Sequence, residues 1–194
     1  IVETAMIMGF PDRLLALERL AAGPVELSGP LRADREAWDL DDVSLEGDPL
    51  IDLRIEETGD GAVRLRGRLV VDVEQECRRC LDPVRSQVGL DLDLRFDPNI
   101  GPEEETEALY ALDPKVAELD LLPALREELL LALPDFALCR DGCRGLCPLC
   151  GTNRNEDDCD CRIEATDPRW DALREKIPSE PDAATGAGDG SGDD

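Results

Sequence analysis

The residues most able to do chemistry in this sequence are its eight cysteines. Two form the pair Cys77-Arg78-Arg79-Cys80, and the other six are Cys139, Cys143, Cys147, Cys150, Cys159 and Cys161. Thiolates separated by two residues can turn back onto one metal ion, as they do in zinc ribbons and zinc knuckles. Six cysteines in so short a segment are hard to explain by packing. The pattern therefore predicts metal binding.

Zinc is the metal that the spacing favours. Cys147-Pro148-Leu149-Cys150-Gly151 is a strong zinc-knuckle signal, because proline shapes the turn and Gly151 lets the backbone approach the sulfurs. Iron–sulfur binding is an alternative, but the spacings match neither common ferredoxin pattern. Eight thiolates divide into two tetrahedral sites. Closed four-thiolate sites leave no position for water or substrate, so both zinc ions are predicted to be structural.

Two divisions of the cysteines are compatible with the spacing. In the favoured division, Cys147 to Cys161 supply four thiolates that close a self-contained knuckle, and Cys77 and Cys80 join Cys139 and Cys143 in a long-range site. In the alternative, Cys139, Cys143, Cys147 and Cys150 form one site. The first pair also fits a redox dithiol or thiols without function, but a redox pair requires a strand-to-helix setting, whereas this one is flanked by predicted strands.

The segments that must position these thiols predict an α+β fold built on an antiparallel β-sheet. Three segments alternate apolar and polar residues with period two: 51–55, 63–73 and 88–96. This period is the signature of strands buried on one side, and the turn at 58–61 favours a hairpin between the first two strands. The first cysteine pair follows the second strand.

One long and one or two short helices are predicted to pack on the sheet. Leucines form a broad helical stripe over residues 120–133, with Asp120 as the cap and Pro134 as the stop. Short helices are predicted over 12–23 and over 167–177.

The remaining segments are predicted to be irregular. Residues 24–49 are interpreted as loop with one short strand, and the acidic stretch 99–113 as an exposed loop. The resulting domain plan is an α+β core at 1–138, a cysteine-rich zinc-binding segment at 139–162, a short C-terminal helix at 163–177 and a disordered acidic tail at 178–194.

Composition excludes several classes of function. The chain has 46 acidic and 21 basic residues, a formal net charge of −25, and no histidine. A Ser-His-Asp triad, a histidine general base and a histidine-containing zinc site are therefore excluded. No nucleophile is paired with a base and no glycine-rich phosphate loop is present, so we expect no enzyme and no small-molecule substrate. The acidity also argues against broad binding to naked nucleic acid or to anionic membranes.

Five arginines are the candidate contacts to RNA or a protein partner: Arg64, Arg66 and Arg68 along one face of a predicted strand, and Arg78 and Arg79 within the first cysteine pair. The competing interpretation is that the strand arginines pair across the sheet with Asp91 and Asp93, as exposed opposite charges commonly do.

Three segments together resemble the large ribosomal RNA subunit accumulation protein family (YceD-like), in its cysteine-rich form. They are Cys77-Arg78-Arg79-Cys80-Leu81-Asp82-Pro83-Val84, the leucine-rich stretch 120–134, and the cysteine-rich stretch 139–153 with Cys159-Asp160-Cys161. The resemblance implies a small cytoplasmic bacterial protein needed for 23S ribosomal RNA to accumulate, and hence for large-subunit biogenesis. It implies no catalytic residues.

Two other functions are compatible with the residues: a zinc-stabilised interaction adaptor unrelated to ribosomes, for example a transcription-linked one, and a thiol redox or metal-storage protein. For a ribosome assembly factor, the acidity favours a basic ribosomal protein or assembly factor as partner over naked RNA. The first residues lack the features of a signal peptide, Met6 or Met8 is a candidate start, and clustered cysteines suit the reducing cytoplasm.

Overall fold

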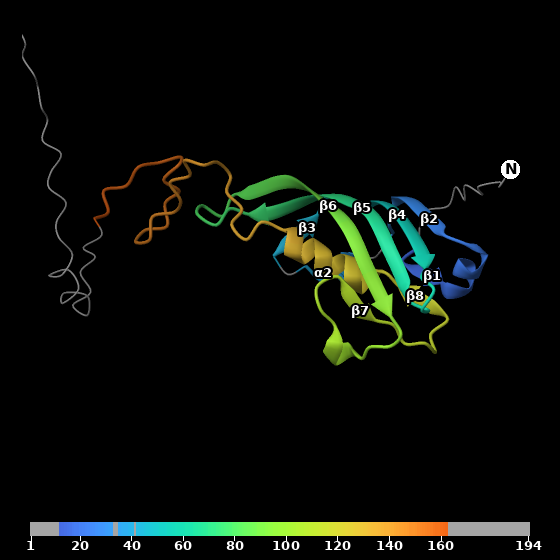
Figure 1. Ribbon diagram of the computed structural model, residues 1–194. Helices are drawn as coiled ribbons and strands as arrows, with labels where there is room; N and C mark the ends of the chain where they lie inside the picture. Colours follow the sequence, from blue (N-terminus) through green and yellow to red (C-terminus); the bar gives the residue numbers. More distant parts are fainter. Residues whose placement is uncertain (1–11, 33–34, 41, 163–194) are drawn as a thin grey trace, which may run out of the picture.

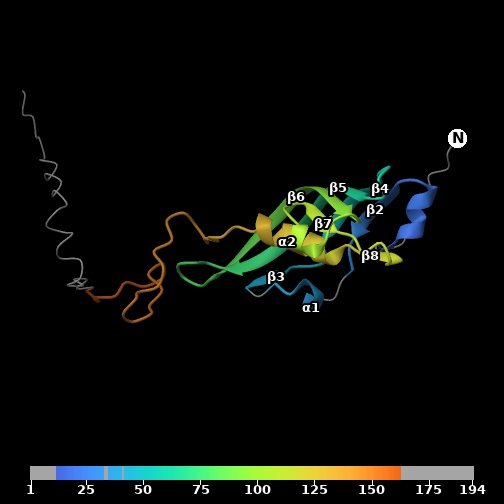
Figure 2. The same cartoon turned by 60° about the horizontal axis from the view of Figure 1, so that its bottom comes forward.

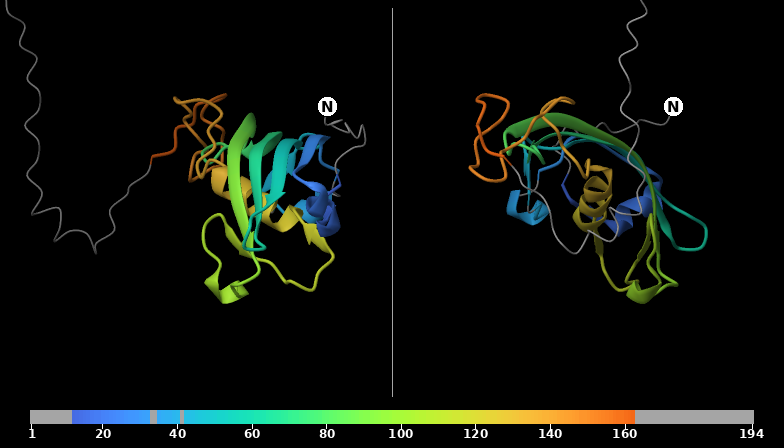
Figure 3. Two further views of the ribbon diagram at one scale, coloured as in Figure 1. Left: turned by 45° about the vertical axis from the view of Figure 1, so that its right-hand side comes forward. Right: turned by 90° about the vertical axis from the view of Figure 1, so that its left-hand side faces the viewer.

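A strongly curved β-sheet wrapped around one helix organises the chain (Figure 1). The computed structural model describes residues 12–32, 35–40 and 42–162. Helix α2 (Leu122–Ala132) lies in the concave face of the sheet, which is clearest when the sheet is viewed along its strands (Figure 3). The predicted α+β fold fits this arrangement, in which the sheet predominates.

Six strands form the main sheet in the order β2-β4-β5-β6-β7, with β3 also paired to β5. Neighbours are antiparallel except β6 and β7, which are parallel. The strands are β2 (Val25–Pro30), β3 (Val43–Leu45), β4 (Leu50–Glu57), β5 (Val63–Glu76), β6 (Pro83–Asp97) and β7 (Leu109–Ala111).

The three strands predicted from period-two alternation are confirmed as β4, β5 and β6. The apolar residues at alternate positions of β5 are buried: Val63, Leu65, Leu69, Val71 and Val73. The chain turns between β4 and β5 where Thr58 N–H donates to the carbonyl of Ala62 at 2.7 Å. β5 and β6 continue beyond the end of β4 as a long ribbon, which carries the first cysteine pair at its tip (Figure 2).

The helix predicted from the leucine stripe over 120–133 is found as α2. Leu121, Leu125 and Leu129 are fully buried against the sheet, and the Asp120 carboxylate accepts a hydrogen bond from Leu122 N–H at 3.1 Å. Leu133 follows the last helical turn, and Pro134 prevents its continuation. No helix within the described ranges is long and apolar enough to span a bilayer.

The helix predicted over 12–23 is wrong in its first half. Residues Leu14–Ala16 form strand β1, which pairs with β8 (Glu118–Asp120), and only Leu17–Ala22 are helical, as the 3₁₀ helix η1. Pairing with β8, a partner about a hundred residues away in sequence, overrides the weak helical preference of so short a segment.

Two predicted loops also contain regular structure. Residues 24–49 hold β2, β3 and the short helix α1 (Arg35–Trp38), so there are two strands where one was expected. Within 99–113 lie the 3₁₀ helix η2 (Pro102–Glu104) and β7, whose Tyr110 ring stacks on Phe96 of β6. The helix predicted at 167–177 and the tail at 178–194 lie outside the described residues.

Candidate metal centres

The first cysteine pair lies in a tight turn at the tip of the β5–β6 ribbon. Cys77 N–H donates to the carbonyl of Asp82 at 2.8 Å, and Leu81 N–H donates back to the carbonyl of Cys77 at 2.9 Å. Together these bonds close the turn so that both sulfurs face the same side. Cys77 and Cys80 are buried.

The segment after α2 brings a second pair of sulfurs to this turn. It is held by hydrogen bonds from Arg78 N–H to the carbonyl of Ala137 at 2.9 Å and from Leu146 N–H to the carbonyl of Arg79 at 2.8 Å. Gly145 lies so close to Arg79 that a Cβ there would be 2.8 Å from its carbonyl oxygen. Only glycine fits this approach.

Four sulfurs converge as a result: those of Cys77, Cys80, Cys139 and Cys143, all within 4.8 Å of one another. The Cys77–Cys143 and Cys80–Cys139 sulfur separations are 3.8 and 3.6 Å. Four thiolates bound to zinc at about 2.3 Å in a tetrahedron have sulfurs about 3.8 Å apart, whereas a disulfide needs about 2.05 Å. The sulfurs fit a tetrahedral metal ion and form no disulfide.

The second cluster consists of Cys147, Cys150, Cys159 and Cys161, whose sulfurs also lie within 4.8 Å of one another. Cys147 is buried, and the other three are half-buried or exposed. The structure thus groups the sulfurs into the two sets that the spacing favoured, and it does not bring Cys139, Cys143, Cys147 and Cys150 together as one set.

The turns at Cys77 and Cys147 have the same hydrogen-bond pattern. Cys147 N–H donates to the carbonyl of Thr152 at 2.8 Å, and Gly151 N–H donates to the carbonyl of Cys147 at 2.8 Å. The residue four places after each first cysteine has a left-handed backbone, with φ of 64° at Leu81 and 74° at Gly151. The chain therefore builds the same knuckle twice, although the first carries no knuckle proline or glycine.

The pKa values of four cluster thiols are lowered, those of Cys77, Cys143, Cys147 and Cys150, which favours their thiolate forms. Burial raises the pKa of Cys77, but hydrogen bonds from the backbone N–H groups of Cys139, Arg79 and Cys80 outweigh burial and lower it to about 6. The pKa of Cys150 is also lowered to about 6, here by the hydroxyl and the backbone N–H of Thr152. Thiolates are the form that binds metal.

Other thiols of the same clusters are shifted in the opposite direction. Burial raises the pKa of Cys80 and of Cys139. The pKa of Cys161 rises to about 12, chiefly because it hydrogen-bonds to Cys150. Closely spaced thiols cannot all ionise against their mutual repulsion, and a divalent cation at the centre of each cluster removes that repulsion.

Two asparagines that the sequence reading missed link the clusters. Asn155 Nδ2 donates to Cys143 Sγ at 3.3 Å, and its Oδ1 accepts a hydrogen bond from Arg144 N–H at 2.8 Å. Asn153 Nδ2 lies 3.4 Å from the carboxylate of Asp82. Both asparagines lie between cysteines of the second cluster in sequence, yet they contact the first. Only the pattern Asn-x-Asn between the knuckle cysteines could have signalled them.

The strand arginines mostly pair with acids of the sheet. Arg64 makes two hydrogen bonds to the Asp93 carboxylate, at 2.7 and 2.6 Å, which lower the pKa of that carboxyl. Arg66 lies 3.8 Å from Asp93 and 3.9 Å from Glu56. Among the described residues, Arg68 makes no ion pair, and neither does Asp91.

The remaining two arginines contact the segment that follows α2. Arg79 Nη1 donates to the carbonyl of Cys143 at 2.9 Å. Arg78 Nε donates to the carbonyl of Asp135 at 3.0 Å, and its guanidinium lies 5.3 Å from the centre of the Phe136 ring. Both arginines therefore help to join the ribbon tip to the chain that follows α2.

A curved sheet that carries two clusters of four thiols at one end defines a class of protein with two candidate metal centres. The sequence profile of the family described as "Large ribosomal RNA subunit accumulation protein YceD" matches residues 65–175. This match covers more than half of the chain, and the chain belongs to this family.

Related proteins are found in bacteria and plants. An uncharacterized protein of Mycobacterium tuberculosis is 34% identical over 137 residues, which cover 70% of this chain and 65% of the relative. The chain thus spans slightly less than two thirds of that relative's length. A protein of Arabidopsis thaliana named "Large ribosomal RNA subunit accumulation protein YCED homolog 1, chloroplastic" is 35% identical over 60 residues, 31% of this chain and 19% of the relative. No solved structure shows significant similarity.

Proposed function

We propose that this protein is a non-enzymatic factor for the accumulation of 23S ribosomal RNA, and so for biogenesis of the large ribosomal subunit. The match to the YceD family over residues 65–175 carries the proposal. The name of the Arabidopsis relative supports it. The family is named for an effect on RNA level, and the thiols form closed sets that suit a structural role.

The proposal includes two structural zinc ions. Cys77, Cys80, Cys139 and Cys143 would hold the first, and Cys147, Cys150, Cys159 and Cys161 the second. The sulfur separations of 3.6 and 3.8 Å in the first cluster support tetrahedral zinc. Zinc here supplies no reaction. It ties the exit of α2 to the tip of the β5–β6 ribbon and closes the loop of the cysteine-rich segment at 139–162.

A basic ribosomal protein or assembly factor is the proposed partner, in preference to naked RNA. The net charge of −25 supports this choice, because RNA binding requires an excess of basic side chains. The pairing of Arg64 and Arg66 with Asp93 supports it too. Reduced thiols suit the bacterial cytoplasm as the location.

Deletion of the gene tests the proposed function. We expect the ratio of 23S to 16S ribosomal RNA and the level of large subunits to fall, and the wild-type gene to restore both. A copy carrying C77S and C139S should fail to restore them. C77S alone, with added zinc, should restore them in part. A normal ratio in the deletion strain would defeat the proposal and favour an adaptor role unrelated to ribosomes.

A further inference from the structure

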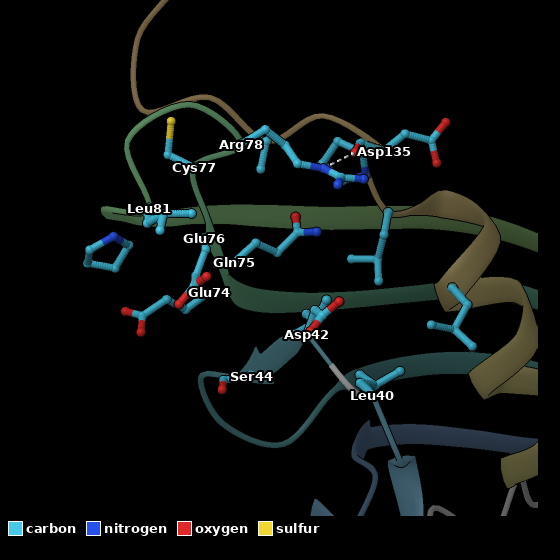
Figure 4. A pocket seen from close by; sticks show the side chains of 16 residues that line it. Leu40, Asp42, Ser44, Glu74, Gln75, Glu76, Cys77, Arg78, Leu81 and Asp135 are labelled. Atoms are coloured by element: carbon cyan, nitrogen blue, oxygen red, sulfur yellow. Dashed lines mark hydrogen bonds between the residues drawn. The ribbon is translucent and has the colours of Figure 1, made fainter. Parts of the chain in front are cut away.

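A groove with a volume of about 800 Å³ lies beside the first cysteine cluster (Figure 4). Its walls are β3 with the residues leading into it, the last residues of β5, and the exit of α2. Of the eight cysteines, only Cys77 lines it. The groove therefore adjoins the first cluster and shares one residue with it.

The floor of the groove is apolar. Leu130 comes from the last turn of α2 and Leu133 directly follows it, Leu40 and Val43 come from the segment around the start of β3, and Ala137 comes from the chain after the helix. Leu130 is 40% exposed, whereas Leu40, Val43 and Leu133 pack partly against the core. These side chains provide a surface that an apolar anchor from outside can cover.

The rim of the groove is acidic. Four carboxylates and a single guanidinium line it: Asp42, Glu74, Glu76, Asp135 and Arg78. Glu74 is paired with Arg85 at 2.8 Å, and Arg78 is held by the Asp135 carbonyl and the Phe136 ring. Within the described part of the chain, Asp42, Glu76 and Asp135 have no ion-pair partner. The charge of the groove thus matches a cationic occupant and repels phosphate groups.

A buried hydrogen-bond acceptor faces the same place. Gln75 Oε1 is buried and accepts no hydrogen bond from the described residues. In Figure 4 the side chain of Gln75 extends from β5 into the space between Asp42 and the exit of α2. Buried polar atoms of proteins are nearly always paired, so this acceptor leaves the hydrogen bonding of this wall of the groove incomplete within the described residues.

We propose that this groove binds a basic segment of a partner protein. An apolar side chain of the segment covers Leu130 and Leu133, and lysine or arginine side chains reach Asp42, Glu76 and Asp135. This assignment rests on the proposed function, because a basic ribosomal protein or assembly factor is the partner expected there, and it identifies the surface that such a partner contacts.

Binding of synthetic peptides to the zinc-loaded full chain tests the groove. The probes are a lysine-rich peptide containing leucines, the same peptide with serine in place of leucine, and a single-stranded RNA oligonucleotide, all measured by calorimetry at physiological salt. We expect the leucine-containing peptide to bind at least about tenfold more tightly than its serine version. Equal binding of the two peptides, or tighter binding of the RNA, would overturn the proposal.

Matched variants separate the groove from the general acidity of the chain. D42K/E76K reverses two rim charges, and E103K/E107K makes the same charge change in the exposed segment around η2. L130S removes a floor side chain, and L131S changes its more exposed neighbour, which does not line the groove. D42K/E76K and L130S should each weaken binding about tenfold, and the two controls should stay within about twofold. An equal loss in a variant and its control would contradict the assignment.

Two other occupants would reveal themselves in the same experiments. Residues 163–194 of this chain include Arg169 and Arg174; if R169E/R174E tightens peptide binding, the chain's own segment competes for the groove and the assignment to a partner fails. If light scattering shows a dimer that D42K/E76K dissociates, the occupant is a second copy.

Complementation distinguishes failure of this inference from failure of the proposed function. The groove assignment and the proposed function are both supported if the deletion strain loses 23S ribosomal RNA and if E103K/E107K restores it whereas D42K/E76K does not. If both variants restore the RNA, the groove assignment fails while the proposed function survives. If deletion has no effect on the RNA while the peptide results hold, the proposed function fails and the groove remains a binding site for basic segments.

Discussion

The two knuckles place different residues in one backbone conformation. Leu81 and Gly151 each follow the first cysteine by four positions and have φ of 64° and 74°. A left-handed conformation costs a residue with a side chain about 1–2 kcal/mol, and glycine pays almost none of this cost. The first knuckle therefore holds local strain that the second avoids.

This difference predicts opposite effects of two substitutions. Leu81→Gly should raise the free energy of unfolding of the zinc-loaded protein by about 1 kcal/mol, because it relieves the strain at a side chain that is 55% exposed. Gly151→Ala should lower the stability of the second knuckle by a similar amount. Urea unfolding provides the measurement. Gly142→Ala, at a position with open space around it, is the control. Stabilisation by both substitutions would contradict the equivalence of the knuckles.

Asn155 is expected to tune the metal affinity of the first cluster from a position in the second. Its amide donates to Cys143 Sγ and lowers the pKa of that thiol. Groups that hydrogen-bond to metal ligands typically change metal affinity by about 10- to 100-fold. Asn155→Ala should thus weaken zinc binding at the first cluster about tenfold, as measured by competition with a chromophoric chelator. Asn99→Ala, in a turn after β6, should leave the affinity unchanged.

At the scale of single residues, the sequence predicts ligands better than their supporting contacts. Cysteine spacing favours the two sets of sulfurs that the structure brings together, because a knuckle requires two thiols at a fixed separation. The contacts of Asn153 and Asn155 cannot be predicted in this way. A hydrogen bond to a sulfur or to Asp82 requires only an amide that the fold brings near.

At the scale of elements, prediction succeeds where a segment is long enough to carry its own period. β4, β5, β6 and α2 are each at least eight residues long, and each is found over the segment whose alternating or helical pattern predicted it. The three-residue strands β1 and β7 have no period of their own. They exist because β8 and β6 offer unpaired backbone groups to them, which is tertiary information.

One glycine allows β5 to lie close against β4. At Gly67 of β5, φ is 147°, and a Cβ would lie 1.9 Å from the carbonyl oxygen of Asp52 in β4. Gly67→Ala should destabilise the protein by at least about 2 kcal/mol, because the clash is with backbone that cannot move without breaking the pairing. Gly89→Ala in β6 meets only the end of the Arg68 side chain, at 3.3 Å, and should cost far less. Similar denaturation curves for the two variants would contradict this account.

At the scale of the whole molecule, acid should weaken the fold through its paired carboxylates. Hydrogen bonds from Thr58 and then from Arg95 hold the pKa of Asp60 well below its usual range, and Arg64 lowers the pKa of Asp93. A carboxyl whose pKa is depressed by folding stabilises the protein above its unfolded pKa of about 4 and loses that contribution as the pH falls below it.

Asp60→Asn measures this contribution. The variant should be less stable than the wild type at neutral pH, and the difference should shrink steadily as the pH falls below about 4. Asp91→Asn, at a carboxylate with no ion pair in the described residues, is the control for the loss of a charge. A stability difference that does not change with pH would show that Asp60 acts only through the shape of its turn.

The two metal centres should contribute unequally to the whole fold. The first joins the tip of the β5–β6 ribbon to the chain that leaves α2, so Cys77→Ser should lower the stability of sheet and helix together. The second ties only residues within 147–161, so Cys150→Ser should remove hydrogen-exchange protection there and leave β5 and β6 protected.

The asparagine contacts add one refinement to this asymmetry. If Asn155 is positioned by a closed second knuckle, Cys150→Ser should also weaken zinc binding at the first cluster about tenfold, without emptying it. Zinc titration of Cys150→Ser, of Asn155→Ala and of the variant that carries both checks the link. Both substitutions remove the same contact, so their effects should not add in the double variant. Additive losses would mean that the second knuckle stabilises the first by a route other than Asn155. Loss of protection across the sheet in Cys150→Ser would mean that the two centres fold as a single unit.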